Sequence, residues 1–167
     1  KGKDFLQMST EEIDSEIRLH LGEYMRLYMG DSEEMSLRFN YLYSRLYKIL
    51  THLFDRLVAE FSDSDFEPCD FELAIGRNEI VKPFKVPLKE GCVELIGKID
   101  RVDKMDADGK RFIRIVDYKT GAKTFNLSDV FYGMNMQMLL YLVSIWRGGT
   151  GFYENITPSG ILYFPAR

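Results

Sequence analysis

Cysteine and histidine are scarce in this chain of 167 residues, which contains two of each. Cys69 and Cys92 lie far apart, without a CxxC pair or other ligands beside them, so the chain cannot build a zinc site or an iron–sulfur cluster of its own. We interpret both as buried free thiols. His20 and His52 have no acidic motif around them and give no support to a nucleophile activated by histidine.

Long apolar runs are absent as well. No stretch approaches the roughly 18 uncharged apolar residues that a membrane-spanning helix needs, and the N-terminus lacks the charged-then-apolar pattern of a signal peptide. We therefore expect a cytoplasmic protein. The chain begins with Lys1 rather than methionine and ends on a strand-like segment, 160–164, so we expect that it is excised from a longer protein.

Positive charge is not in excess, since the formal net charge is −4, and this argues against a general polyanion-binding protein. The balance is reversed locally between Lys98 and Lys123, where eight basic residues accompany five acidic ones. This window has a net charge of +3 and leaves −7 for the rest of the chain. A surface that follows phosphates and a solvated pair of strands explain the reversal about equally well.

The sequence does contain ample material for one packed domain, with 46% hydrophobic and 14% aromatic residues. Its first part is helical. Ser9 and Glu12 have the spacing of a capping box, which predicts a helix over 10–29. The segment 30–32 interrupts it, and apolar residues then recur every three or four positions over 35–57, which predicts a second, long helix.

The middle part is rich in β-forming residues, in segments bounded by Gly, Pro and Asp. Strands are predicted over 71–75, 93–97 and 112–116. Between the last two lies Asp108-Gly109, a pair typical of the centre of a two-residue hairpin. In that register position 107 pairs with position 110, and Asp100 lies directly opposite Asp117.

Residues that face each other across an antiparallel pair have Cβ atoms roughly 4.5–5.5 Å apart. Asp100 and Asp117 would therefore converge, and Lys119 would share their face because strand side chains alternate, with Lys98 opposite it. Two adjacent carboxylates repel each other unless a cation compensates them, and hard oxygen ligands suit Mg²⁺ or Mn²⁺. The hypothesis is a metal site for phosphodiester hydrolysis. An exposed strand pair with alternating charges is the alternative.

The last part predicts a helix that begins at Thr124 or Ser128 and ends at Gly148-Gly149, apolar nearly all round and therefore buried. Gln137 and Tyr141 are one turn apart on one side of it. Both could face the predicted sheet and orient the lysine or a phosphate. A structural role, in which the Gln amide satisfies backbone groups, is the alternative.

In their order and spacing, these motifs resemble those of the RecB-like branch of the PD-(D/E)xK nuclease superfamily, and especially the nuclease domain of AddB-type helicase–nuclease subunits. The resemblance covers residues 66–167. The segments that carry it are Phe66-Glu67-Pro68 with Glu72, Gly97-Lys98-Ile99-Asp100-Arg101-Val102-Asp103, Ile115-Val116-Asp117-Tyr118-Lys119-Thr120-Gly121, Tyr132-Gly133, and the pair Gln137 and Tyr141.

The resemblance implies an α/β fold with a restriction-endonuclease-like core, in which a central mixed β-sheet is flanked by helices. Residues 66–167 would form the catalytic core. An N-terminal helical segment, residues 1–65, would precede it, and the two would together be a fragment that contains a single nuclease domain.

The resemblance also implies roles for individual residues. Asp100 and Asp117 would bind the metal, Mg²⁺ or Mn²⁺, together with the main-chain carbonyl of Tyr118. Lys119 would orient or help to deprotonate the attacking water and would stabilise charge on the phosphate. Glu72 matches an upstream acid that lies near the metal in some relatives.

Gln137 and Tyr141 would be the supporting pair of the family's catalytic helix. Two family features are missing from the chain. Many RecB-like nucleases have a metal-binding His in a Gly-x-x-x-His-like segment, but His52 lacks that context, so we expect that helix upstream of Lys1. The iron–sulfur cluster of AddB-type subunits would need cysteines outside this sequence.

The leading hypothesis is therefore a metal-dependent DNA nuclease, an exonuclease on single-stranded DNA ends, in a helicase–nuclease complex for double-strand break repair and recombination. Its partners would be DNA and an AddA-type helicase subunit, without a membrane. A stand-alone nuclease of the Cas4 type is one alternative. A catalytically inactive nuclease fold that binds DNA or a partner as a scaffold is the other.

Overall fold

The computed structural model describes residues 4–29, 37–119, 121, 128, 132 and 136–166. Contacts divide the chain into two compact units, one formed mainly by the chain up to Ser64 and the other by Asp65–Pro165. None of the described helices combines the length and the apolar character of a membrane span.

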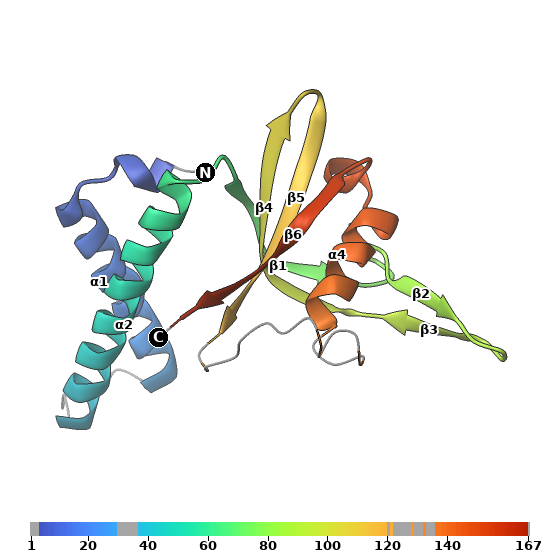
Figure 1. Cartoon of the computed structure of the whole chain (residues 1–167). Coiled ribbons are helices and arrows are strands. Elements are labelled where there is room, and N and C mark those ends of the chain that lie inside the picture. The colour runs from blue at the N-terminus through green and yellow to red at the C-terminus, as the bar shows by residue number, and fades with distance from the viewer. Residues whose placement is uncertain are drawn as a thin grey trace. The chain divides into compact units, whose positions relative to one another are not determined.

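The first unit is helical (Figure 1). It contains a short 3₁₀ helix, η1 (Asp4–Gln7), and the helices α1 (Thr10–Met29) and α2 (Leu37–Ser62). A reciprocal capping box starts α1, since Ser9 Oγ accepts the N–H of Glu12 at 3.2 Å and Glu12 Oε2 accepts the N–H of Ser9 at 2.7 Å. Both predicted helices are confirmed. The predicted interruption at 30–32 lies outside the described residues.

Aromatic and polar contacts hold the helical unit together. The Phe5 ring meets the rings of Phe54 and Phe61 edge-on, with centroids 5.7 and 5.6 Å away. Asp14 of α1 accepts hydrogen bonds from Arg18 Nε, at 2.7 Å, and from the hydroxyl of Tyr47 in α2. These bonds, that from Arg18 above all, hold the pKa of Asp14 below its ordinary value.

The second unit is built on a four-stranded sheet (Figure 1). In sheet order the strands are β1 (Glu67–Ile75), β4 (Gly97–Ala107), β5 (Lys110–Lys119) and β6 (Thr157–Pro165). The first two pairings are antiparallel and the third, between β5 and β6, is parallel. The sheet is thus mixed, and with helix α4 (Gln137–Gly148) packed on it the predicted α/β class is confirmed.

The turn between β4 and β5 has the predicted form. Asp108 and Gly109 both have positive φ, 52° and 70°, as the mirror-image turns of two-residue hairpins require. Ala107 pairs with Lys110, and the ladder continues in step to the pair of Arg101 and Val116. The register predicted from the Asp-Gly pair is confirmed over this ladder.

The core of this unit lies between the sheet and α4. Ile99 of β4 and Ile113 of β5 are almost fully buried, and they belong to one apolar cluster with Leu142 and Ile145 of α4. Burial of large aliphatic side chains contributes about 1.5–3 kcal/mol each. This cluster fixes the helix on the face of the sheet.

The predicted strand 93–97 is wrong as a single element, because two sheets divide it. β3 (Cys92–Leu95) pairs with β2 (Phe84–Pro87) in a separate two-stranded ribbon, which extends away from the main sheet in Figure 1. In the sequence, Ile96 separates the end of β3 from the start of β4 at Gly97. The β-propensity of the segment is real, but propensity does not reveal a change of partner within a run.

The last helix differs from its prediction in extent and burial. α4 begins at Gln137, with Met136 as its N-cap. In the first turns of the predicted helix, the described residues show one helical hydrogen bond, from the Tyr132 N–H to the Ser128 carbonyl at 3.1 Å. The helix buries one face only, since Trp146 is 45% exposed. The end at Gly148 is confirmed.

The two thiols differ from each other. Cys69 is partly buried and its Sγ lies 3.3 Å from the Val102 carbonyl oxygen, and burial raises its pKa to about 12. Cys92 is exposed at the end of the β2–β3 ribbon. The prediction that both are buried is therefore wrong for Cys92, which is exposed, and holds only in part for Cys69.

Candidate active site

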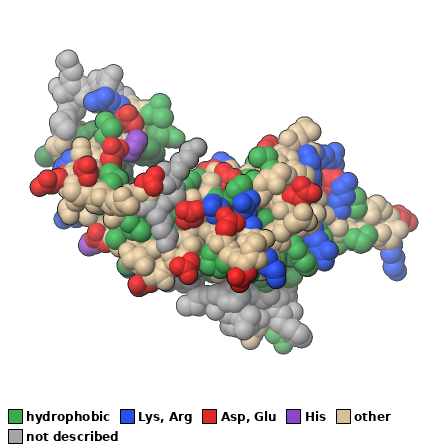
Figure 2. Space-filling model, turned by 90° about the horizontal axis from the view of Figure 1, so that it is seen from above, with side chains coloured by type: hydrophobic (Ala, Val, Ile, Leu, Met, Phe, Trp, Pro, Cys, Tyr) green, Lys and Arg blue, Asp and Glu red, His purple; other side chains and the backbone are tan. Residues whose placement is uncertain are grey.

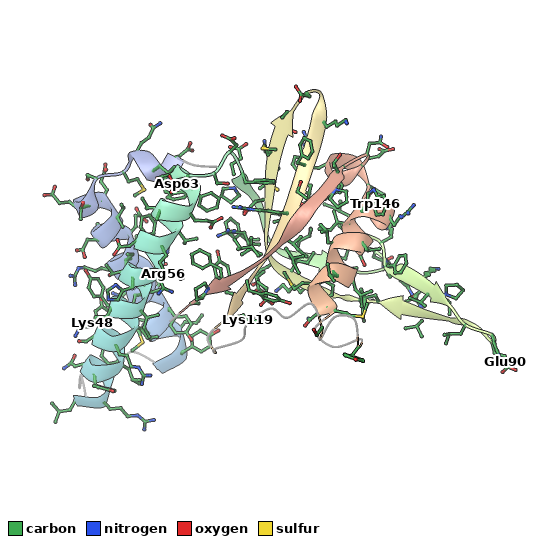
Figure 3. All side chains as sticks on the ribbon, in the orientation of Figure 1. Lys48, Arg56, Asp63, Glu90, Lys119 and Trp146 are labelled. Atoms are coloured by element: carbon green, nitrogen blue, oxygen red, sulfur yellow. The ribbon has the colours of Figure 1, made fainter. Side chains whose placement is uncertain are left out.

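The candidate active site lies where β4 starts and β5 ends. Because the two strands are antiparallel, the start of one adjoins the end of the other, and Asp100 and Asp117 are the next residues beyond the last pair of the ladder, Arg101 and Val116. Lys119 follows at the end of β5, as Figure 3 shows. The hairpin therefore brings together residues that are 17 or more positions apart in the sequence.

Asp100 is bonded to the backbone of β5. Its Oδ2 accepts the main-chain N–H of Tyr118 at 2.9 Å, and the ladder of main-chain pairs ends at this point. A carboxylate thus takes the place of a main-chain acceptor. This bond fixes the acid beside the segment that contains Asp117 and Lys119.

Asp117 and Lys119 form an ion pair through Oδ2 and Nζ. Their side chains are 16% and 29% exposed, so the pair is largely shielded from solvent. The contact agrees with the expectation that residues two apart on a strand share a face. The lysine supplies positive charge to a place where Asp100 and Asp117 bring two negative charges.

Lys98, which was predicted to lie opposite Lys119, forms an ion pair with Glu72. Their ion pair measures 2.5 Å, and both side chains are about 60% exposed. The neighbouring pairs of Phe71 with Arg101 and Leu73 with Ile99 place Glu72 level with Asp100, but Glu72 has a φ of 55° and drops out of the ladder. Among the described residues no three His, Cys, Asp or Glu side chains gather in a group that could hold a metal.

Gln137 and Tyr141 contact each other across one turn of α4. Gln137 Nε2 donates to the Tyr141 hydroxyl at 2.9 Å. Tyr141 is buried against the first residue of β4, where a Cβ on Gly97 would lie only 2.6 Å from Tyr141 Cζ. Gln137 itself is exposed, which the prediction of a buried Gln did not anticipate. Their effect on Lys119 or a phosphate stays a prediction.

Tyr163 is a neighbour of the site that the sequence did not indicate. It pairs with Asp117 in the parallel ladder, and its ring centroid lies 5.6 Å from Lys119 Nζ. Burial, followed by the Asp117 charge, raises the pKa of Tyr163. Its strand was predictable, but the register of a parallel pair depends on a long connection and has no local turn signal.

A buried ionic network is the second feature that the sequence did not indicate. Arg101 Nε and Arg114 Nε lie 2.9 and 2.8 Å from the two oxygens of Asp103, and Arg101 Nη1 donates to the Tyr118 hydroxyl at 3.0 Å. Burial is the largest effect on Asp103 and raises its pKa, against the lowering effect of both arginines. Tyr118 therefore connects this network to Asp100.

Three oxygen groups near this end of the hairpin could hold a hard divalent cation. They are the carboxylates of Asp100 and Asp117, on adjacent strands, and the main-chain carbonyl of Tyr118. Such oxygens are the ligands that Mg²⁺ and Mn²⁺ prefer, with water and substrate completing the coordination.

Comparison with known proteins gives a consistent result. The family model described as the PD-(D/E)XK nuclease superfamily matches residues 6–167. The chain is 35% identical over 164 residues to the B subunit of the ATP-dependent helicase/deoxyribonuclease of Caldanaerobacter subterraneus, and 37% identical over 164 residues to that of Clostridium tetani. The corresponding protein of Clostridium acetobutylicum is 40% identical over 137 residues.

These alignments cover most of the chain but little of each relative. They include 95%, 94% and 81% of the chain, and 14%, 14% and 12% of the respective relatives. The chain thus spans about one seventh of the length of the curated relatives that it matches.

Proposed function

Because the chain belongs to the PD-(D/E)XK nuclease superfamily, we propose that it is a metal-dependent deoxyribonuclease that hydrolyses phosphodiester bonds. The observation that carries the proposal is the convergence of Asp100 on the β5 segment that contains Asp117 and Lys119. Two acids and a lysine provide a cation site and a positive charge for a phosphate. A scaffold that only binds DNA would have no need of this complete set.

Asp100, Asp117 and the Tyr118 carbonyl are the proposed metal ligands. When bound, Mg²⁺ or Mn²⁺ would polarise the phosphate and lower the pKa of a coordinated water. Glu72 is a further candidate ligand, although its carboxylate now faces Lys98. Its two neighbours in β1 pair with the two neighbours of Asp100 in β4, which places it beside Asp100 in the order of the strands.

Lys119 is proposed to stabilise the charge of the phosphate and to orient the attacking water. It now pairs with Asp117, and its partly exposed ammonium can exchange a carboxylate oxygen for a phosphate oxygen without leaving this face of the strand. Gln137 and Tyr141 are proposed to support the site from α4. Tyr141 does so by packing on Gly97, three residues before Asp100.

The role of the longer protein is part of the proposal. The relatives are named as the B subunit of an ATP-dependent helicase/deoxyribonuclease. By analogy we propose that this chain is the single nuclease domain of such a protein, that an AddA-type helicase subunit is its partner, and that single-stranded DNA ends produced in double-strand break repair are its substrate.

The decisive experiment is cleavage of end-labelled linear and circular single-stranded DNA with Mg²⁺ or Mn²⁺. Asp117→Ala and Lys119→Ala should each reduce the rate by roughly 100-fold or more, since each removes a charge that acts on the reacting phosphate. Asp106→Ala and Lys110→Ala, at the other end of the same hairpin, are the matched controls and should retain activity.

The outcomes separate the proposals. Cleavage of linear DNA alone would support an exonuclease, whereas cleavage of the circle would show endonuclease activity. Absence of cleavage with either metal, in a chain that circular dichroism shows to be folded, would mean either that the chain lacks the expected upstream metal-binding histidine or that it is a scaffold.

A further inference from the structure

A groove at the base of the β2–β3 ribbon is lined by charged residues that the proposed chemistry does not use. It consists of two adjoining pockets of about 480 and 500 Å³ that share Arg77 and Glu94. Ile75, Gly76 and Ile96 line the first pocket, and Lys82, Pro83 and Lys85 line the second.

The basic side chains of the groove are arranged around one carboxylate. Glu94 is 16% exposed, and its two oxygens lie 2.5 Å from Arg77 Nε and 3.2 Å from Lys85 Nζ. Arg77 and Lys85 are 79% and 63% exposed, so the acid lies beneath and the cations face solvent. Their hydrogen bonds lower the pKa of Glu94 and keep it ionised.

Lys82 adds a third positive charge and contacts Arg77. Its Nζ donates to the main-chain carbonyl of Arg77 at 3.0 Å. Three positive charges thus accompany the negative charge of Glu94, and Glu79, whose side chain lies over Gly76, adds a second acid, so the net charge of the group is +1. Arg77 contacts Glu94 through Nε. The two terminal nitrogens of its guanidinium can therefore donate the bidentate hydrogen bonds that suit a phosphate.

The groove adjoins the start of β4, the strand that contains Asp100. Ile96, which lines it, immediately precedes β4, and Asp100 lies four residues further along the chain. At about 3.3 Å per residue this separation is roughly 13 Å. A nucleic-acid strand bound at Asp100 and Asp117 would cover that distance within a few nucleotides.

We propose that Arg77, Lys82 and Lys85 bind backbone phosphates of the DNA strand whose scissile bond occupies the active site. The inference rests on the proposed nuclease function and identifies where the substrate strand continues. Contacts to phosphates rather than to base edges would make this binding independent of sequence.

The test measures binding separately from cleavage. The full chain is titrated with labelled oligothymidylate in EDTA, by fluorescence anisotropy at several salt concentrations. Arg77→Ala/Lys85→Ala should weaken binding by about tenfold and reduce the slope of log affinity against log salt by about 1.4, at roughly 0.7 per phosphate contact on a single strand.

Matched controls remove the same charge elsewhere. Lys89→Ala acts at the ribbon tip, next to Glu90 in Figure 3, and Lys110→Ala acts at the tip of the β4–β5 hairpin. Both should retain wild-type slopes. Because the double variant leaves Glu94 without these partners, Arg77→Ala/Lys85→Ala/Glu94→Gln is tested beside it and should show the same loss.

Equal losses in the controls, or unchanged binding in the double and triple variants, would overturn the proposal. Cleavage then separates it from the proposed function. The variants should lose activity on long DNA and retain it on a small phosphodiester such as bis(p-nitrophenyl) phosphate. A wild-type chain that cleaves neither substrate would count against a nuclease function of this chain on its own, while the binding data would still decide whether the groove holds DNA.

Discussion

Tyr118 forms hydrogen bonds through both its main chain and its side chain. Its main-chain N–H holds Asp100, and its hydroxyl accepts a hydrogen bond from the buried Arg101. Arg101 in turn is anchored by Asp103. The network therefore restrains the backbone beside a proposed metal ligand. Residues that hydrogen-bond to metal ligands commonly have this effect in metal sites.

Tyr118→Phe is predicted to loosen the site without removing a ligand. Loss of the hydroxyl leaves a buried guanidinium with one bond fewer, which should reduce the free energy of unfolding by about 1–3 kcal/mol. Affinity for Mn²⁺ should fall about tenfold. Urea denaturation and calorimetric titration measure the two quantities.

Tyr153→Phe is the matched control for that variant. It removes another buried hydroxyl bond, the one donated to Asp70 at 2.7 Å, and should reduce stability without changing Mn²⁺ affinity. If both variants bind Mn²⁺ as the wild type does, Tyr118 does not position the site.

At the scale of elements, the contact between β4 and α4 depends on the absence of a side chain. Tyr141 occupies the space where Gly97 would carry a Cβ, so strand and helix approach closely just before Asp100. This explains the glycine at the start of β4 by close approach rather than by a special backbone angle.

Gly97→Ala is predicted to displace Tyr141 and to reduce the free energy of unfolding by about 1–3 kcal/mol, as overpacking does. DNA cleavage should decrease as well, because the start of β4 moves. Gly160→Ala is the control, since a Cβ there meets nothing within 4 Å in β6. Equal stability of the two variants in urea would contradict the packing argument.

The elements also show which features a sequence can predict. The β4–β5 register was predictable because the Asp108-Gly109 turn encodes it locally, and that register places Asp100 beside Asp117. The ribbon of β2 and β3 was missed although its signal is local, a loop of residues 88–91 that ends on Gly91 with a φ of 91°. Tyr163 was missed for a different reason, since its partner strand is distant in sequence.

At the scale of the whole molecule, neither sign of charge has a large excess. The net charge is −4, and the face seen in Figure 2 carries both acidic and basic side chains. Binding of ions or DNA therefore has to depend on local groupings, such as the two acids of the site, rather than on the total charge.

Divalent metal is predicted to stabilise the whole folded chain. A ligand that binds only the native state adds about 2.7 kcal/mol at a concentration of 100 times its Kd. Mn²⁺ or Mg²⁺ should therefore raise Tm, and Asp100→Asn and Asp117→Asn should abolish the increase. Differential scanning calorimetry measures both, with Asp106→Asn as a control that retains the increase.

The same measurement decides the role of Glu72. If its carboxylate joins the metal, Glu72→Gln reduces the rise in Tm, whereas a full rise would remove Glu72 from the proposed ligands. A Tm that metal leaves unchanged in the wild type would contradict the two-acid site itself.

The tight turn at Asp108 and Gly109 lies at the opposite end of the hairpin ladder from Asp100 and Asp117. Both ends belong to the same pair of strands, so a label attached at the turn is separated from the two acids by the fixed length of the hairpin. The turn is therefore a suitable attachment point for a fluorophore or a surface tether in measurements on single molecules of this chain.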